Sequence, residues 1–455
     1  MKLFTGGKSM LVILLSFVVL IGYAGTCSKK SSSDSSAGSS APAAAQGPAW
    51  GVPALLETDN TGAVNGTYLA MNASGNAIAL WEQSNGTTYH LYANSYIAGS
   101  GWSSGTLVET EAAFDVFDIR LAMNSSNKAI AVWRQFDGTT RNIWANVAVT
   151  GTIWGTAQLI ETDNTGDTYN PQVAINNSGD AVAIWIQNDG VTDNICANFY
   201  ISGTGWGVAG IIEANPGTAG SPQIVLDNAG NAIAVWTQND GIWFSIYSNR
   251  YISGTGWAGS VTLEGAGGDA YAPHISVDGA GNAMAVWAQA PSPSIYANRY
   301  VSGTGWAGAE EIEPGTVGAS VPQVSMYGIG NAIVVWNQVT IQYGCIAFGN
   351  TYISGTGWAG AEIICSGTEV TTEPRIAINA SGDAFAIWYQ FDLVRTSIYA
   401  NRYVAGTGWG TSTAIESRGE NAGSHKIGID NSGRAIAIWV QSDGTADSLW
   451  YNRFE

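Results

Sequence analysis

Tryptophans that follow tight turns recur along this chain at a regular spacing. Seven of them follow a glycine-containing or similar tight turn and lie about 51 residues apart: Trp102, Trp154, Trp206, Trp257, Trp306, Trp358 and Trp409. An indole combines a large apolar face with a polar N–H, so a ring held at a turn with amides nearby can stack on a sugar. These seven residues are therefore candidate glycan-binding residues. The alternative is that the same rings cover strand edges in a repetitive core.

Two amide side chains recur with the same period. A glutamine stands two residues after a second recurrent tryptophan in all eight copies: Gln83, Gln135, Gln187, Gln238, Gln289, Gln338, Gln390 and Gln441. An asparagine recurs as Asn94, Asn146, Asn198, Asn249, Asn298, Asn350, Asn401 and Asn452. Eight symmetric ligand sites are one interpretation. Because a buried polar group without a partner costs about 1–3 kcal/mol, we favour a structural role in which these amides pair with backbone groups.

Carboxylates follow the repeat as well and predict an acidic surface. A glutamate ends the first apolar run in seven copies: Glu57, Glu109, Glu161, Glu213, Glu264, Glu313 and Glu416. The loops that follow, such as residues 161–167 and 188–193, are also acidic. We expect these groups on one face, where the longer and more varied loops form the binding surface. A merely solvated acidic rim is the alternative.

Metal-binding and catalytic patterns are weak. Asp163, Asn164 and Asp167 could offer oxygen ligands to Ca²⁺, but the spacing of a calcium-binding loop is absent, so we expect no obligatory cofactor. No acid stands at a fixed spacing from the three histidines, His90, His274 and His425. We therefore expect no catalytic residues.

The residues above belong to a unit of about 51 residues that occurs eight times after residue 49. Each unit has four runs of β-forming residues separated by turn signals. The most regular run, Ala181–Trp185 in one copy, is apolar on both of its faces, so both must be buried. Four-stranded sheets packed on both faces by copies of themselves are propeller blades. We predict an all-β, eight-bladed β-propeller of four-stranded blades.

The two ends of the repeat region predict how the ring closes. A lone first run, Trp50–Glu57, precedes the first complete unit, and the last unit stops at Tyr451–Glu455, where another first run should follow. Pairing of the N-terminal strand with the last blade would complete eight blades and remove two exposed sheet edges.

Local resemblances accompany this fold. The hairpins Asp227–Asn231 and Asp278–Asn282 resemble those of NHL-type and SBBP-type bacterial propeller repeats, which implies a blade fold only. The Gly-x-Gly-Trp turns resemble those of fucose-binding propeller lectins, which implies a sugar ligand. A sialidase-like site would need arginines on the inner strands, whereas we place four arginines on third strands: Arg250, Arg299, Arg402 and Arg453.

The first 48 residues predict export. Residues 1–26 have a basic start and an apolar run too short to cross a bilayer, and they resemble a secretory signal peptide. Residues 24–27, Ala-Gly-Thr-Cys, resemble a bacterial lipoprotein box, which implies lipidation of Cys27; simple cleavage and release is the alternative. Residues 27–48 are a flexible Ser/Ala/Gly-rich tether before the propeller at 49–455. We expect a lipid-anchored protein at the bacterial cell envelope, at the outer membrane or cell surface.

Three cysteines lie within the repeats. Counting strand positions outward from the turn at 354–357 makes Cys345 and Cys365 near neighbours on adjacent strands, so we predict a disulfide between them. A slip of one residue in this register would put the two side chains on opposite faces. Cys196 occupies a position that is aromatic in the other seven units, and we expect a buried, unreactive thiol there.

The net charge and the small number of basic residues limit the classes of partner that this protein could bind. The net charge is −18 with 17 Lys and Arg residues, which argues against nucleic acid and anionic membrane surfaces as partners. The leading hypothesis is a monomeric, non-enzymatic binding module displayed at the envelope, with a glycan or a protein as ligand. One alternative is a structural or adhesion scaffold that docks a basic protein on the acidic face, with salt-sensitive association. The other is an envelope hydrolase with a site built from loops.

Overall fold

The computed structural model describes residues 48–455 except positions 58, 60, 61, 111, 112, 164, 165, 266, 292, 314–317, 341–343, 368, 392, 393 and 418, and only the backbone at position 345. Pro48–Glu455 forms one compact unit. The predicted signal peptide, Cys27 and the tether up to residue 47 lie outside the described residues. The described part of the chain contains no helix that is long and apolar enough to cross a membrane.

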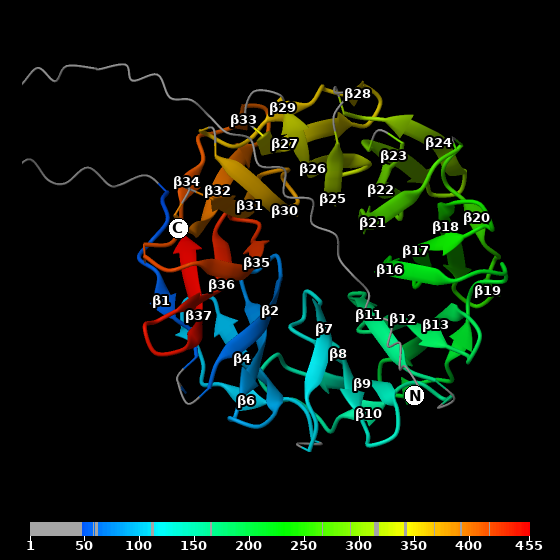
Figure 1. Cartoon of the computed structure of the whole chain (residues 1–455), viewed down its shortest axis with the longest axis horizontal. Coiled ribbons are helices and arrows are strands. Elements are labelled where there is room, and N and C mark those ends of the chain that lie inside the picture. The colour runs from blue at the N-terminus through cyan, green and yellow to red at the C-terminus, as the bar shows by residue number, and fades with distance from the viewer. Residues whose placement is uncertain are drawn as a thin grey trace, which may run out of the picture. The chain divides into compact units, whose positions relative to one another are not determined.

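Eight antiparallel sheets surround a common centre (Figure 1), so the protein is an all-β, eight-bladed propeller, as predicted. We number the blades 1 to 8 by their inner strands, which surround the centre of the ring. These strands are β2 (Val64–Met71), β7 (Val116–Met123), β11 (Thr168–Ile175), β16 (Ala219–Leu226), β21 (Ala270–Val277), β25 (Ala319–Tyr327), β30 (Val370–Ile378) and β35 (Ala422–Ile429).

The second strand of each blade is buried on both faces. In blade 3, for example, Ala183, Ile184 and Trp185 have no exposed surface. Trp185 packs with Val132 of the preceding blade, so the hydrophobic core lies between adjacent blades. The second strands are β3 (Ala77–Ser84), β8 (Ala129–Phe136), β12 (Ala181–Asn188), β17 (Ala232–Asn239), β22 (Ala283–Gln289), β26 (Asn331–Thr340), β31 (Ala384–Phe391) and β36 (Ala435–Ser442).

Two further strands complete each blade. The third strands are β4 (Tyr89–Ile97), β9 (Arg141–Ala148), β13 (Asp193–Ile201), β18 (Phe244–Ile252), β23 (Ser294–Val301), β27 (Gly344–Ile353), β32 (Thr396–Val404) and β37 (Asp447–Phe454). The outer strands are short, and several are divided into two pieces: β5 (Gly101–Trp102) and β6 (Thr106–Leu107), β10 (Gln158–Leu159), β14 (Gly205–Trp206) and β15 (Gly210–Ile211), β19 (Gly256–Trp257) and β20 (Val261–Thr262), β24 (Gly305–Glu311), β28 (Gly357–Trp358) and β29 (Glu362–Ile363), and β33 (Gly408–Trp409) and β34 (Thr413–Ala414).

The ring closes through the N-terminal strand, which confirms the predicted arrangement. Strand β1 (Ala54–Leu55) pairs antiparallel with β37 as the outer strand of blade 8. A bridge between Trp50 and Phe454 extends this pairing. The two ends of the described chain therefore share one sheet (Figure 1).

The recurrent glutamines hold the second strands in place. In all eight blades the indole N–H of the second-strand tryptophan donates to Oε1 of the glutamine two residues later, at 2.9–3.1 Å. In six blades the amide nitrogen donates to a backbone carbonyl, as from Gln238 to Asn215 O at 2.7 Å. These contacts confirm the structural interpretation of the glutamines.

The recurrent asparagines connect neighbouring blades. In seven blades Nδ2 of the asparagine donates at 2.6–3.0 Å to a carbonyl at the outer strand of the preceding blade, as from Asn249 to Ile212 O. Arginines on the third strands also reach the next blade: Arg299 lies 5.6 Å from the ring centroid of Tyr352, a cation–π contact. The asparagines are therefore structural, as expected.

The recurrent glutamates do not form an exposed acidic rim, contrary to our expectation. Less than a tenth of the surface is exposed for Glu57, Glu109, Glu161, Glu313 and Glu416. The reason is the strand register, which brings these carboxylates against backbone N–H groups of the third strand. The N–H of Ile143, for instance, donates to Glu161 at 3.0 Å, and burial raises the pKa of Glu161 to about 7. Loop aspartates such as Asp189 remain exposed, whereas most of the recurrent glutamates do not.

Candidate functional site

Every inner strand carries a β-bulge at the same place. In blade 4 the ladder to the second strand is interrupted between Gly220 and Gln223, and in blade 7 between Thr372 and Arg375. In seven blades a residue of the bulge has φ between 49° and 53°, which is uncommon for residues other than glycine: Asp118, Asn170, Ser221, Ala272, Val321, Glu373 and Ser424. Backbone strain of this kind costs about 1–3 kcal/mol per residue and clusters at functional sites.

The bulge directs one side chain of each blade toward the centre of the ring. This residue pairs with the one that precedes the second-strand tryptophan, as Gln223 does with Val235. The eight equivalent residues are Tyr68, Arg120, Gln172, Gln223, His274, Gln323, Arg375 and Lys426. We call them the channel ring.

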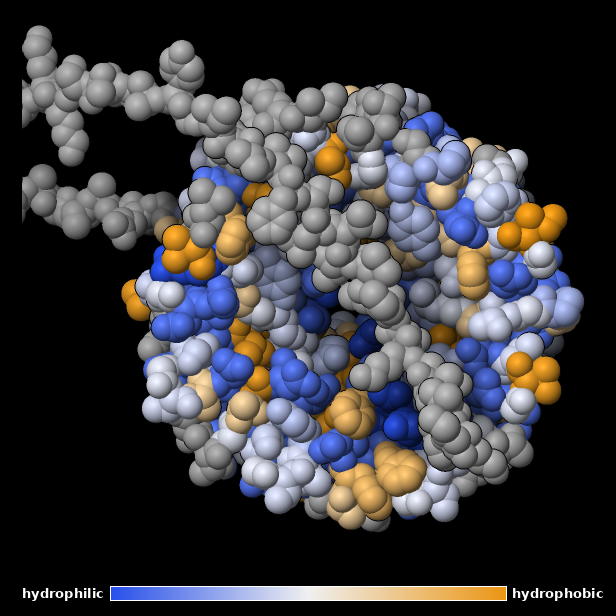
Figure 2. Space-filling model, in the orientation of Figure 1, coloured by the Kyte–Doolittle hydropathy of each residue, from blue (hydrophilic) through white to orange (hydrophobic). Residues whose placement is uncertain are grey.

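All eight residues of the channel ring line one cavity of about 660 Å³. A second cavity, of about 250 Å³, shares five of these residues and extends along the bulges of blades 3 to 6. Figure 2 shows hydrophilic side chains gathered around the hollow at the centre of the molecule. Ligand pockets in proteins commonly enclose about 300–1,000 Å³, so the central cavity is large enough for a small ligand.

Positive charge is concentrated on one side of the channel ring. Lys426 and Arg120 flank Tyr68, with their cationic groups 5.3 and 5.8 Å from its ring centroid. Arg375 comes from blade 7, next to Lys426 in blade 8. The opposite side, blades 3 to 6, presents three glutamines and His274. A chain with a net charge of −18 thus gathers three cationic side chains at its centre.

Two of these cations, Lys426 and Arg375, lie in surroundings that disfavour their charged form. Burial, together with the nearby Arg375 and Arg120, lowers the pKa of Lys426 well below its usual value. Burial also lowers the pKa of Arg375. Nε of Arg375 is buried without a hydrogen-bond partner, and its guanidinium lies 4.0 Å from the Glu373 carboxylate. An unpaired buried donor costs about 1–3 kcal/mol, and more when it is charged, so an anion bound here would be stabilised.

The other polar groups of the cavity are neutral or paired. Burial lowers the pKa of His274 to about 4, and its Nδ1 accepts a hydrogen bond from the N–H of Val324 at 3.2 Å. Burial raises the pKa of Tyr68 to about 12, so its phenol keeps its proton. Asp118 forms an ion pair with Arg134 at 3.1 Å. The arrangement can bind an anionic, hydroxyl-rich molecule through charge, amides and one aromatic ring.

The seven tryptophans predicted to stack on sugars lie away from this cavity, on the outer strands or immediately before them. Each ring is half-buried and packs against a hydrophobic cluster between two blades. Most meet a third-strand tyrosine edge-on, as Trp358 meets Tyr352 with ring centroids 5.2 Å apart. These contacts support the role of covering strand edges.

The calcium site at Asp163, Asn164 and Asp167 stays a prediction. Asp167 forms an ion pair with Arg141 at 2.8 Å, Asp163 lines a separate pocket, and Asn164 lies outside the described residues. Within the parts of the chain that the structure describes, no group of three or more His, Cys, Asp or Glu residues could hold a metal ion.

The cysteines are placed as follows. Cys365 has a free thiol, so the predicted disulfide with Cys345, whose side chain lies outside the described residues, is not formed in this structure. Cys196 is buried and free, as expected. Burial raises the pKa of its thiol to about 12, which makes it a poor nucleophile.

Sequence reasoning missed the channel ring. The placement of Arg299 and its equivalents on third strands is correct, but Arg120 and Arg375 lie on inner strands. A signal for the ring exists: in five units its member directly follows a proline, as Gln172 follows Pro171. In these five units the residue after the proline is Gln, His or Arg, so it is polar in each of them.

The fold is shared with known proteins, although no family model and no curated protein matches the sequence. The BP39L lectin from Burkholderia pseudomallei superposes with a TM-score of 0.53 at 12% identity, over 78% of this chain and 99% of the lectin. The polysaccharide lyase Uly1 has a TM-score of 0.49 at 8% identity, covering 86% and 89%. A Penicillium chrysogenum α-L-arabinanase complexed with arabinobiose has a TM-score of 0.42 at 12% identity, covering 64% and 94%. At these identities the likeness shows the propeller fold alone.

Proposed function

We propose that this protein is a non-enzymatic binding module that holds an acidic carbohydrate, carboxylated or sulfated, in its central channel. The observation that carries the proposal is the one-sided cluster of Arg120, Arg375 and Lys426 on the cavity wall, in which Nε of Arg375 is buried without a partner. Guanidinium groups form strong paired hydrogen bonds with carboxylates and sulfate-like oxyanions.

The rest of the channel ring suits the neutral part of a sugar. Gln223 and Gln323 offer both donors and acceptors to hydroxyl groups. Gln172 adds an amide next to Arg120, whose Nε donates to its Oε1 at 3.2 Å. The ring of Tyr68 supplies an apolar face between two of the cations. A lectin of the same fold is compatible with this use of a propeller.

Binding without turnover is part of the proposal. The described lining holds two carboxylates, Asp118 and Glu373, and each lies beside an arginine. Both carboxylates are therefore held in ion pairs with protein side chains. Product formation from any of the sugars tested below would contradict this part.

The test is calorimetric titration with trigalacturonate, a sulfated disaccharide and the neutral maltotriose. We expect the acidic sugars to bind and maltotriose to bind at least tenfold more weakly. Arg375→Gln and Lys426→Gln should each weaken acidic-sugar binding about 10- to 100-fold, since a hydrogen bond to a charged group contributes about 1.5–3 kcal/mol. The matched control is Arg299→Gln, which removes the same charge from a third strand and should leave the affinity unchanged.

The pH dependence gives a second readout. A bound anion favours the protonated form of Lys426, whose pKa is depressed in the free protein. Affinity should therefore be highest below this depressed pKa and fall as the pH rises through it, and Lys426→Gln should flatten the profile. The proposal is wrong if the protein binds neutral sugars and neither Arg375→Gln nor Lys426→Gln changes their affinity.

We propose that the propeller is displayed at the cell envelope through a lipid on Cys27, on the basis of the apolar run, the small residues before this cysteine and the tether after it. Cys27→Ser should shift the protein from the membrane fraction to the soluble fraction. Unchanged fractionation would exclude the anchor and leave the channel proposal untouched.

A further inference from the structure

Blade 3 lacks an aromatic ring that the other seven blades possess. On each third strand the residue paired with the second-strand tryptophan is aromatic elsewhere: Tyr92, Trp144, Tyr247, Tyr296, Phe348, Tyr399 and Trp450. In four blades the two rings are stacked, with centroids 5.8–6.3 Å apart and planes within 21°. In blade 3, Cys196 faces Trp185 at this place.

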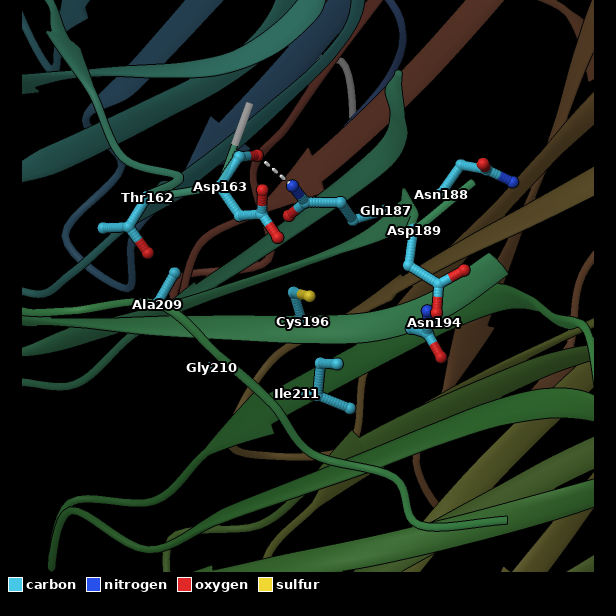
Figure 3. A pocket seen from close by; sticks show the side chains of 10 residues that line it. All are labelled: Thr162, Asp163, Gln187, Asn188, Asp189, Asn194, Cys196, Ala209, Gly210 and Ile211. Atoms are coloured by element: carbon cyan, nitrogen blue, oxygen red, sulfur yellow. Dashed lines mark hydrogen bonds between the residues drawn. The ribbon is translucent and has the colours of Figure 1, made fainter. Parts of the chain in front are cut away.

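The missing ring leaves a pocket of about 140 Å³ (Figure 3). A cavity of about 150 Å³ in another protein accommodates benzene, so this pocket is sized for one six-membered ring. Cys196, Ala209 and Ile211 contribute its apolar wall. The thiol of Cys196 lies at the centre of the pocket in Figure 3.

The mouth of the pocket is polar and negatively charged. Asp163 and Asp189 lie on either side of Cys196 (Figure 3), and Asn188 and Asn194 complete this side of the lining. The carboxylate of Asp189 accepts hydrogen bonds from the N–H groups of residues 191 and 192, both at 2.8 Å. These bonds lower its pKa, so Asp189 is ionised at neutral pH.

We propose that this pocket binds a small planar aromatic ring that carries an ammonium group, with the ring in the place of the missing side chain and the ammonium group at Asp163 and Asp189. The apolar wall and the repeat of aromatic residues in the other blades select the ring. The carboxylates select the positive charge and repel an anion. This site is distinct from the channel and does not rest on the proposed function.

The experiment uses the whole protein and tyramine as the probe, followed by calorimetry. We expect one tyramine per chain, at least tenfold weaker binding of 3-(4-hydroxyphenyl)propionate, which has the same ring and a negative charge, and weaker tyramine binding at high salt. Cys196→Tyr should abolish tyramine binding by filling the pocket, and it should raise the Tm. Cys196→Ala should retain binding, because the thiol takes no part in it.

A second variant tests the proposal even if Cys196→Tyr does not fold. Asp189→Asn preserves the pocket and should weaken tyramine several-fold while leaving the affinity of the channel for trigalacturonate unchanged. Equal binding of tyramine by wild type and both variants, or no binding by the wild type, overturns the proposal. The proposal is also wrong if the wild type binds a neutral hexose but not tyramine and if Cys196→Tyr abolishes the binding of the hexose. The ligand of this pocket would then be a sugar.

Discussion

Deletion of residues 50–57 should lower the free energy of unfolding by at least about 5 kcal/mol and cause the protein to aggregate. The deleted segment contains Leu56, whose side chain is buried. The burial of this side chain contributes about 2–3 kcal/mol to the free energy of unfolding. The deletion also removes backbone hydrogen bonds, including those from Leu56 N to Leu449 O and from Gly51 N to Arg453 O, both at 2.8 Å. Each such bond contributes about 0.5–1.5 kcal/mol. Strand β37 then becomes an exposed apolar edge that can pair with other chains.

Thermal unfolding and light scattering measure this effect. The matched control deletes residues 28–35, the same number of residues outside the blades, and it should behave as the wild type. An added peptide of residues 48–57 should partly restore the Tm of the deletion variant. A deletion variant that does not aggregate and has an unchanged Tm would show that closure through β1 contributes nothing to stability.

The architecture could be predicted because its determinants are repeated and local. The pattern of Ala181–Trp185 occurs in eight copies and is apolar on both faces, and only sheets packed on both sides satisfy it. The repeat region begins with a spare first run, Trp50–Glu57, and its last unit lacks an outer strand, so the two were predicted to pair and close the ring. The pairing of β1 with β37 confirms this prediction. Each inference used periodicity and strand pairing, which a single sequence shows directly.

The channel ring could not be predicted in the same way, because a bulge decides which residue of the inner strand faces the centre. The interruption between Thr372 and Arg375 shifts the alternation by one residue, and a strict two-residue period assigns Arg375 to the wrong face. The glutamates illustrate a related limit. Glu161 was located correctly at a strand end, but the sequence does not show that the N–H of Ile143 lies over it.

Replacement of Gln238 by leucine should cost about 3 kcal/mol or more. The Gln238 side chain is fully buried; it accepts from the indole of Trp236 at 3.0 Å and donates to Glu213 at 3.0 Å and to Asn215 O at 2.7 Å. Leucine leaves the indole N–H and the carbonyl unsatisfied, at about 1–3 kcal/mol each. The control is Gln223→Leu in the same blade, where the amide faces the channel and the loss should stay below about 1 kcal/mol.

A double-mutant cycle and a pH series show whether the network itself is responsible. Trp236→Phe removes the indole N–H, so the double variant with Gln238→Leu should lose less stability than the sum of the single variants. Burial already raises the pKa of Glu213, and the hydrogen bond from Gln238 opposes that rise. Without this bond the pKa rises further, and a carboxyl whose pKa is raised in the folded state loses stability as the pH increases through the interval between its unfolded and folded values. The deficit of Gln238→Leu should therefore be larger at pH 8 than at pH 5, and a deficit that does not change with pH would mean that Glu213 is not coupled to this glutamine.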